Sequence, residues 1–230
     1  YSVHTISAYT KDINEFSAFC THNYDLISLD KAAYVMVRNW IVEMSEEKVT
    51  NRTINRKIAS LKAYFKFLQK IGEIEISPLS KHKALKTAKK VEIPFSEAEM
   101  KAVLSSVVYN NDFEGKRDRL IIHVLYATGM RRSELINLKL SDVNFESNTI
   151  KVLGKRKKER IIPMLQETKD YFDSYYKGRN KLEYITDKSF VFLSKSGNKV
   201  YETLVYRIIN KYFREVSTRV KTSPHILRHT

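Results

Sequence analysis

Residues 1–77 carry three series of apolar residues at spacings of three and four, the period of a helix with one buried face. The series occupy residues 6–19, 33–44 and 54–68, with polar residues between their members. Asp30 has the position and the side chain of an N-cap for the second helix. The pattern therefore predicts a small all-helical region that ends before the first proline of the chain.

Beyond Pro94 the hydrophobic period changes between that of helices and that of strands. Ser96 and Glu99 have the spacing of a capping box, which predicts a helix start. Residues 148–153 and 160–163 predict the two strands of a β-hairpin with a charged turn. The other apolar runs predict a short strand over 190–193, and helices over 118–126, 134–138, 165–176, 201–220 and from Pro224 onward.

These elements predict a mainly α protein with a small β-sheet (fold class α+β) in two domains. A helical domain would span 1–77, a basic linker 78–94 and a second domain 95–230. The linker carries a run of lysines between Ser80 and Lys90. A run of this kind fits two interpretations equally well, a solvated linker or a segment that lies across a phosphate backbone.

The net charge of the chain is +15, and it is unevenly distributed. Residues 1–77 have 10 Lys/Arg and 9 Asp/Glu, whereas residues 78–230 have 31 and 17. Within the first region, residues 51–70 contain six basic side chains and no acidic one. An excess this large and this localised favours nucleic acid as a partner over a merely solvated surface. A membrane surface is the weaker alternative, because the basic helices also have well-formed core faces.

The sequence also bears on the compartment. No apolar run approaches the ~18 residues of a membrane span, and no signal peptide is evident. The single cysteine, Cys20, has no partner for an internal disulfide, so a reducing compartment, the cytoplasm, is expected. The first residue is Tyr1 rather than methionine, so we expect further N-terminal sequence.

Residues 127–135, with the sequence ATGMRRSEL, form the strongest candidate for an anion site. An apolar run over 120–126 precedes them, Gly129 breaks it, and two arginines stand at the start of the next helix. Backbone N–H groups at a helix start favour anions, and arginine can hold a phosphate with two parallel hydrogen bonds. The stretch therefore predicts an anion site on a rigid corner between two helices.

The other groups that carry chemistry lie downstream. His225 and His229 are four residues apart, but Ile226 stands where a zinc protease motif has glutamate, and the other histidines lack ligand spacing. The six glycines never cluster into a phosphate loop. No metal and no cofactor is therefore expected, which leaves Arg131, a hairpin lysine, His225 and Arg228.

This remaining set suits metal-free transfer of a DNA phosphate. Two arginines can neutralise the phosphate oxygens, a histidine can donate a hydrogen bond, and a lysine of lowered pKa can protonate a leaving oxygen. Taken singly, each group has a simpler explanation: Arg131 as an interdomain salt bridge, the lysine as part of a solvated turn, and His225 as a capping residue. The residues alone indicate a basic, two-domain nucleic-acid binder with the elements of phosphoryl transfer.

Three segments resemble the motifs of the tyrosine recombinases, the phage integrase family. Residues 127–135 resemble the family's first-arginine motif, 154–163 its β-hairpin with the catalytic lysine, and 224–230 its His-x-x-Arg motif. Their order and spacing agree with the family. Residues 1–12 and 55–68 are similar to the core-binding domain of Xer-type recombinases and related integrases.

The resemblance implies a role for each matching residue. Arg131 and Arg228 would hold the scissile phosphate, His225 would assist them, and Lys155 would be the general acid for the leaving 5′ oxygen. Glu134 would orient Arg131.

Several supporting positions follow from the same resemblance. Thr128 and Gly129 would shape the corner. The family usually has glycine after the catalytic lysine, and this chain has Arg156, so Lys157 and Lys158 remain rivals of Lys155. The expected DNA contacts are basic side chains of the third helix, the linker, the corner and the hairpin turn: Arg52, Arg56, Lys57, Lys62, Lys86, Lys89, Lys90, Arg132, Lys157 and Lys158.

The implied function is site-specific DNA recombination through a 3′-phosphotyrosyl intermediate, without metal or ATP. A SAM-like core-binding domain (1–77) and a catalytic domain (95–230) would clamp double-stranded DNA. The protein would self-associate or pair with a related recombinase on DNA, as a tetramer in the full-length family.

One departure from the family concerns the nucleophile. The family's tyrosine follows the His-x-x-Arg motif, and none of the 14 tyrosines lies after Arg228. We therefore expect a C-terminally incomplete catalytic domain that does not itself cleave DNA. Two alternatives stay open: a non-catalytic DNA-binding regulator or decoy of the same fold, and a type IB topoisomerase that relaxes supercoils as a monomer.

Overall fold

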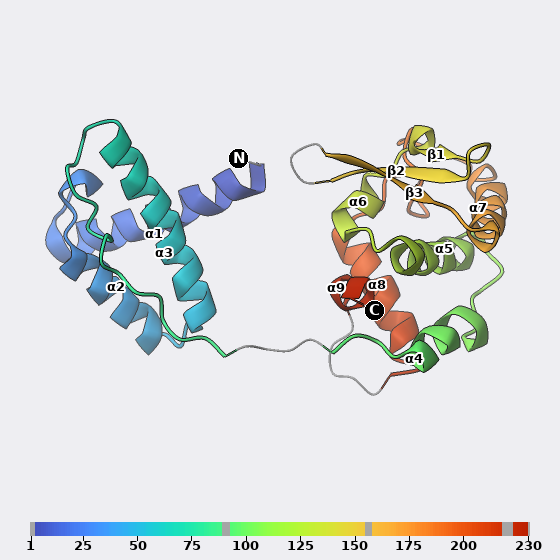
Figure 1. Ribbon diagram of the computed structural model, residues 1–230, viewed down its shortest axis with the longest axis horizontal. Coiled ribbons are helices and arrows are strands. Elements are labelled where there is room, and N and C mark those ends of the chain that lie inside the picture. Colours follow the sequence, from blue (N-terminus) through green and yellow to red (C-terminus); the bar gives the residue numbers. More distant parts are fainter. Residues whose placement is uncertain (1–2, 89–92, 155–157, 218–222, 230) are drawn as a thin grey trace. The chain divides into compact units, whose positions relative to one another are not determined.

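The computed structural model describes residues 3–88, 93–154, 158–217 and 223–229. The chain divides into two compact units, Tyr1–Lys90 and Val91–Thr230, which we treat separately (Figure 1). The prediction of a mainly helical protein with a small sheet is confirmed. No helix within the described ranges is both long enough and apolar enough to cross a bilayer.

The first unit is built from three helices around one core. These are α1 (Val3–Tyr24), α2 (Tyr34–Glu46) and α3 (Asn51–Lys70), and a short 3₁₀ turn, η1 (Leu29–Lys31), precedes α2. α3 packs against both α1 and α2. Most apolar positions of the three periodic series meet in this core, with Phe16, Trp40, Ile54 and Phe65 among its members, whereas Ile6 and Ala33 are exposed.

The start of α2 differs from the prediction. Ala33, which has no side chain to cap the helix, occupies the N-cap position, whereas Asp30 lies in the η1 turn. The prediction of Asp30 as N-cap is wrong, because Asp30 lies inside η1 and Ala32 and Ala33 separate that turn from α2. α3 begins as its sequence suggests, since the Thr50 hydroxyl accepts a hydrogen bond from the Thr53 N–H.

Part of the segment assigned to the linker lies against α3. Leu79 is buried in the core of the first unit, and Leu85 packs on it. The Asn55 side chain pairs with the backbone of Leu85 in both directions: Nδ2 donates to the carbonyl and Oδ1 accepts from the N–H, each at 2.9 Å. Lys62 Nζ also donates to the carbonyl of His82 (3.1 Å). Residues 79–86 thus lie along α3, and we call this segment the strap.

We predict that Asn55→Ala releases this strap. The substitution removes two hydrogen bonds worth about 1 kcal/mol each, so opening should become roughly ten- to thirtyfold more frequent. Limited trypsin digestion should then cleave correspondingly faster after Lys83. Asn39→Ala is the matched control, because Asn39 donates to Tyr24 and not to the strap. Equal cleavage rates in wild type and Asn55→Ala would show that the pairing does not hold the strap.

The second unit wraps its helices around α5 (Phe113–Thr128). α5 packs against α6 (Arg132–Ile136), α7 (Gln166–Arg179), α8 (Glu202–Phe213) and α9 (Pro224–His229). Figure 1 shows the sheet on one side of α5 and α8 on the other. The unit begins with α4 (Glu97–Lys101), which has the predicted capping box of Ser96 and Glu99 and continues as a π-helical turn, Ala102–Ser106.

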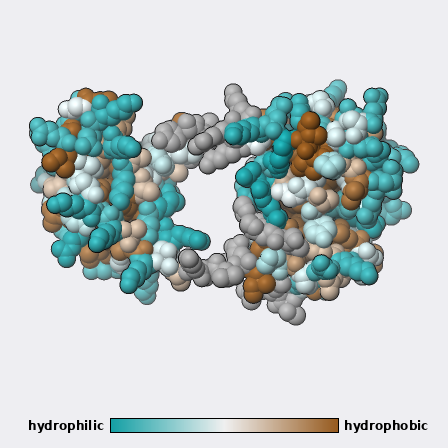
Figure 2. Space-filling model, viewed as in Figure 1, coloured by the Kyte–Doolittle hydropathy of each residue, from teal (hydrophilic) through white to brown (hydrophobic). Residues whose placement is uncertain are grey.

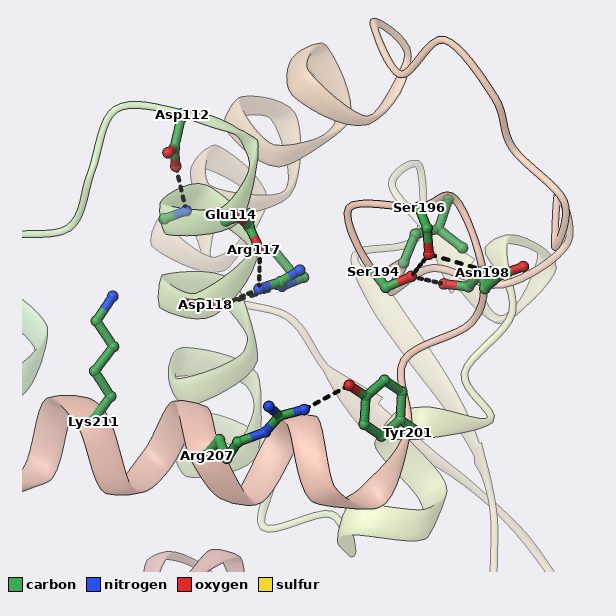
Figure 3. Close-up of polar contacts among 12 residues, drawn as sticks. Asp112, Glu114, Arg117, Asp118, Ser194, Ser196, Asn198, Tyr201, Arg207 and Lys211 are labelled. Atoms are coloured by element: carbon green, nitrogen blue, oxygen red, sulfur yellow. Dashed lines mark hydrogen bonds and ion pairs between the residues drawn. The ribbon is translucent and has the colours of Figure 1, made fainter.

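Buried polar groups fix α5 at its N-terminal half. Asp112 caps the helix by accepting the Gly115 N–H at 2.8 Å (Figure 3). Asp118 is buried, accepts two hydrogen bonds from its neighbour Arg117, and also accepts the Tyr212 hydroxyl of α8. Burial raises the pKa of Asp118, and Arg117 opposes that shift. This network holds α5 and α8 together and thereby supports the corner at the other end of α5.

The sheet is antiparallel with strand order β1-β2-β3. β1 is Val143–Asn144, which follows the 3₁₀ turn η3 (Leu140–Asp142), and the predicted hairpin is confirmed as β2 (Thr149–Leu153) and β3 (Glu159–Pro163). Ile150 and Val152 face the core while their neighbours are exposed, the alternation expected of a half-buried sheet. The strand predicted over 190–193 is wrong: Phe190 and Leu193 form only isolated bridges, to Lys139 and Lys199.

Candidate active site

The corner between α5 and α6 is built by two residues that precede its arginines. Gly129 ends α5 in the left-handed conformation (φ +57°), and its N–H donates to the Leu125 carbonyl. The Thr128 hydroxyl donates to the Val124 carbonyl (2.6 Å) and accepts the N–H of Met130 (3.2 Å). Met130 is fully buried, so the turn is anchored in the core and delivers Arg131 in a fixed position.

Arg131 is held by Glu134. Its backbone N–H donates to Glu134 Oε2 and its Nη1 to Glu134 Oε1, both at 2.7 Å. The Arg131 side chain is 45% exposed, whereas that of Glu134 is 5% exposed. The remaining donors of the Arg131 guanidinium have no partner among the described residues, so they are available to an external oxygen ligand.

The helix start contributes less to anion binding than the sequence suggested. α6 has only five residues, and Glu134 already accepts the N–H of Arg131. The preference for an anion at this corner therefore rests on the guanidinium of Arg131 and not on the helix terminus.

Arg160 of β3 is a functional candidate that the sequence reasoning did not identify. Its Nη1 and Nη2 donate to Glu134 Oε1 (3.1 Å) and Oε2 (2.8 Å), a bidentate pair. Arg160 is paired across the hairpin with Val152, which is buried. An arginine on the inward-facing side of a strand needs a carboxylate partner, and that alternation is the signal that points to it.

Glu134 consequently accepts four hydrogen bonds from two arginines. Burial alone raises the pKa of its carboxyl, but the hydrogen bonds from Arg160 and from the backbone and side chain of Arg131 outweigh burial and lower the pKa to about 2. The carboxylate therefore stays charged at every physiological pH and keeps its hold on both guanidinium groups.

We predict an acid dependence of stability from this group. Because the pKa of Glu134 is lower in the folded state, its contribution is complete above about pH 5 and is lost as the pH falls towards about 2. The free energy of unfolding of Glu134→Gln should therefore lie below that of wild type at pH 6, and the gap should narrow at pH 3, as urea unfolding would measure. Glu183→Gln, an exposed carboxyl, is the control. A gap that stays constant with pH would contradict the prediction.

The root of the hairpin adjoins the same carboxylate. The Gly154 N–H donates to the Lys158 carbonyl at 2.7 Å, which joins the end of β2 to the start of β3. A Cβ at Gly154 would lie 3.5 Å from Arg160 Nη1 and 3.7 Å from Glu134 Oε1. Lys158 is exposed. Lys155 and Lys157, the predicted general acid and its rival, lie outside the described residues, although Lys155 directly follows Gly154 in the chain.

The helix with the His-x-x-Arg motif begins where the sequence predicted. In α9, Ser223 Oγ accepts the Ile226 N–H, and Ile226 and Leu227 are buried in the core of the unit. Arg228 is half-buried, and its Nη1 is buried without a hydrogen-bond partner among the described residues. An unpaired buried guanidinium nitrogen is costly, and an oxygen ligand at this place would satisfy it. The side chain of His225 lies outside the description.

α8 brings the corner and this helix together. It packs against both α6 and α9 (Figure 1). Arg132, predicted as a DNA contact, forms an ion pair at 2.5 Å with Glu202 of α8 and thus joins α6 to α8. A depression of about 660 Å³ opens beside the corner. Its lining includes Arg131, Glu134, Lys151 and Glu159, so it mixes both signs of charge.

The predicted DNA contacts of the first unit differ in whether a carboxylate of the protein already binds them. Arg52 is exposed and has no partner among the described residues. Arg56 forms a bidentate pair with the buried Asp12 of α1, and Lys57 is paired with Glu15 of α1. Two of the predicted DNA contacts thus support the packing of α3 on α1.

The remaining predicted contacts are Lys62 of α3, which binds the strap, and three lysines at positions 86, 89 and 90. Lys62 Nζ donates to the strap at His82, and Lys86 is exposed. Lys89 and Lys90 lie outside the described residues. Figure 2 shows hydrophilic side chains over most of the visible surface of each unit, which suits a polar, charged partner. Within the described ranges, no three His, Cys, Asp or Glu side chains gather as metal ligands would.

Comparisons with known proteins cover the whole chain. Residues 105–230 match the phage integrase family, and residues 1–72 match the phage integrase N-terminal SAM-like domain. Tyrosine recombinase XerC of Staphylococcus haemolyticus is 30% identical over 230 residues, which cover 100% of this chain and 76% of that protein. XerC of Oceanobacillus iheyensis is 32% identical over 235 residues, with 100% and 75% covered.

Solved structures show the same fold. The XerH site-specific recombinase bound to palindromic difH substrate, a post-cleavage complex, aligns with a TM-score of 0.79 at 20% identity, covering 99% of this chain and 67% of that one. The Tn1549 transposon integrase in complex with transposon right end DNA aligns with a TM-score of 0.78 at 23% identity, covering 100% and 80%. The match of both domains and the identity to XerC proteins show that the chain belongs to the phage integrase family of tyrosine recombinases.

Proposed function

We propose that the protein carries out site-specific DNA recombination, with residues 1–230 supplying the DNA clamp and the phosphate grip. The observation that carries the proposal is the corner at Arg131. There a buried carboxylate holds an arginine whose remaining donors have no partner among the described residues and can bind a phosphate. The unpartnered Nη1 of Arg228 supports it, because a phosphate oxygen would satisfy that buried donor.

The chemistry that fits this grip is transfer of a phosphodiester to a tyrosine. The tyrosine oxygen attacks phosphorus, a 3′-phosphotyrosyl bond forms, and the bond to the 5′ oxygen breaks. Arg131 and Arg228 neutralise the charge that builds on the nonbridging oxygens, and His225 assists them. Lys155 gives a proton to the leaving 5′ oxygen, which becomes a free hydroxyl.

Rejoining reverses the same steps with a 5′ hydroxyl from another duplex. This hydroxyl attacks the phosphotyrosyl phosphorus, the tyrosine leaves, and a new DNA strand is sealed. The covalent intermediate retains the energy of the broken bond, so the reaction needs no ATP. Lys155 would act as a base in this direction, by microscopic reversibility.

The attacking tyrosine would follow Arg228 in chain order, as the family resemblance implies. All 14 tyrosines of residues 1–230 precede Arg228, and Tyr212 is the last of them. Burial raises the pKa of Tyr212 and of its stacking partner Tyr109, which disfavours either as a nucleophile. We therefore assign the nucleophile to none of the tyrosines in residues 1–230.

The partners that we propose follow from the reaction. Double-stranded DNA is the substrate, and strand exchange between two duplexes requires several recombinase subunits, either copies of this protein or a related recombinase. We place the protein in the cytoplasm, where its DNA substrate lies and where the free, buried thiol of Cys20 stays reduced.

The experiment that tests this function uses the 230-residue chain and a library of random DNA duplexes. Repeated selection for bound duplexes should enrich one sequence, called the selected duplex below. The logarithm of its binding constant should fall with the logarithm of salt concentration with a slope of about −5 or steeper, as expected for six or more phosphate contacts. Binding without sequence enrichment, or binding that salt does not weaken, would count against the proposal.

A further inference from the structure

Glu134 divides its carboxylate between two arginines from different elements. Arg131 comes from the start of α6, and Arg160 comes from β3, 26 residues after Glu134. One negative charge thus faces two positive ones, and the cluster keeps a net charge of one positive unit. Arg160 has no role in the reaction described above, and both of its Nη atoms are bound to Glu134.

We propose that Arg160 is a positioning residue that shares Glu134 with Arg131 and so leaves Arg131 charged and oriented for a DNA phosphate. This inference rests on the proposed function, because it concerns the phosphate that Arg131 is proposed to hold. Arg160 itself touches neither the phosphate nor the nucleophile.

Glu134 is more deeply buried than either of its arginine partners. Its side chain is 5% exposed, whereas those of Arg131 and Arg160 are 45% and 38% exposed. Without Arg160, this shielded carboxylate would pair with Arg131 alone, and the pair would be neutral. A neutral pair attracts an anion far more weakly than a pair that carries a positive charge, above all where water is partly excluded. Arg160 therefore maintains the charge that makes the corner an anion site.

Arg160 also lies close to the end of β2. Arg160 is paired with Val152 across β2 and β3, and a Cβ at Gly154 would lie 3.5 Å from its Nη1. Lys155, the proposed general acid, is the next residue after Gly154. The guanidinium of Arg160 thus lies beside Gly154, the residue that precedes Lys155 in the chain, while it binds the carboxylate that holds Arg131. It links the position of the phosphate grip to that of the hairpin.

The test measures how strongly one phosphate contributes to binding. The selected duplex is prepared with a neutral methylphosphonate at each backbone position in turn, and its affinity for the 230-residue chain is compared with that of the unmodified duplex. The phosphate of interest is the one whose neutralisation weakens binding to wild type but not to Arg131→Ala. For each protein, we define the phosphate gain as the dissociation constant of the duplex neutralised at this position divided by that of the unmodified duplex.

We expect Arg160→Ala to lower the phosphate gain about tenfold, close to the effect of Arg131→Ala, although Arg160 does not touch DNA. Arg160→Ala combined with Glu134→Gln should restore the gain to within about threefold of wild type, because the neutral amide no longer cancels the charge of Arg131. Lys177→Ala removes one exposed charge from α7 and should leave the gain unchanged.

A second variant covers the case in which the double variant does not fold, which thermal unfolding would reveal. Arg160→Lys keeps the positive charge beside Glu134 but not the bidentate geometry, and it should retain most of the phosphate gain. The inference is overturned if Arg160→Ala leaves the gain at the wild-type value. It is also overturned if the folded double variant stays as weak as Arg160→Ala, since Arg160 would then act on DNA directly. If no phosphate depends on Arg131, the proposed function itself fails.

Discussion

Replacing Arg131 with alanine should lower strand cleavage by the complete gene product by about 10²- to 10³-fold, the usual effect of removing one donor that stabilises developing charge. The side chain of Arg131 is 45% exposed, and the guanidinium donors that Glu134 does not use have no partner among the described residues. The fold should survive, because Glu134 keeps its bidentate partner Arg160.

The measurement is the rate of cleavage of the selected duplex by wild type and by Arg131→Ala at equal occupancy. Lys177→Ala provides the control for the loss of one charge. Thermal unfolding of the variant should show a folded protein. A cleavage rate within about threefold of wild type would remove Arg131 from the phosphate grip.

Arg228→Met should separate function from stability. Cleavage should fall by about 10²- to 10³-fold, as for Arg131, because the second positive group on the phosphate is lost. Stability should not fall, since the Nη1 of Arg228 is buried without a partner among the described residues, and its removal relieves an unsatisfied donor. Methionine keeps much of the apolar volume of the arginine stem in the contact of α9 with the core.

Urea unfolding of the DNA-free protein measures the second half of this prediction. We expect the free energy of unfolding of Arg228→Met to equal that of wild type or to exceed it by up to about 1 kcal/mol. Arg179→Met is the matched comparison, because the Nη2 of Arg179 donates to the carbonyls of Lys188 and Phe190, and its loss should be destabilising. Arg228 would be a structural residue if both variants were destabilised to the same degree.

Much of the fold is predictable from local pattern. The helical series of the first unit, the capping box at Ser96, the hairpin and the start of α9 each depend on residues within a few positions of one another. The corner was predictable for the same reason, because Gly129 ends one helix and Arg131 stands at the start of the next. Local signals sufficed wherever the interacting groups were close in sequence.

The predictions that the structure corrects or adds to depend on contacts between distant residues. Arg160 meets Glu134 across 26 positions, and no local spacing reports that pairing. Arg56 and Lys57 looked like free cations on a basic helix, but their partners lie more than 40 positions upstream on α1. Charge counts along the chain cannot distinguish a cation that faces DNA from one that is already paired.

The docking of the strap could not be predicted either, because it depends on hydrogen bonds to backbone groups of distant residues. Its lysines suggested a linker, although Leu79 and Leu85 pack on the core of the first unit. The hydrogen bonds that hold residues 79–86 come from side chains of α3, above all the amide of Asn55, and they pair with backbone groups that every residue possesses. The strand predicted over 190–193 failed for a related reason, because an apolar run can fill a core with only isolated bridges to other segments.

The most direct test of the account is a search for the covalent intermediate. The complete gene product is incubated with the selected duplex carrying a nick on the 3′ side of the phosphate that depends on Arg131. Cleavage then releases a short fragment with a 5′ hydroxyl, which diffuses away, and the intermediate accumulates. We predict a protein–DNA adduct that survives denaturation, maps to a tyrosine after Arg228 in chain order, and nearly disappears in Arg131→Ala. No adduct from wild type, or an equal yield from Arg131→Ala, would contradict the central claim.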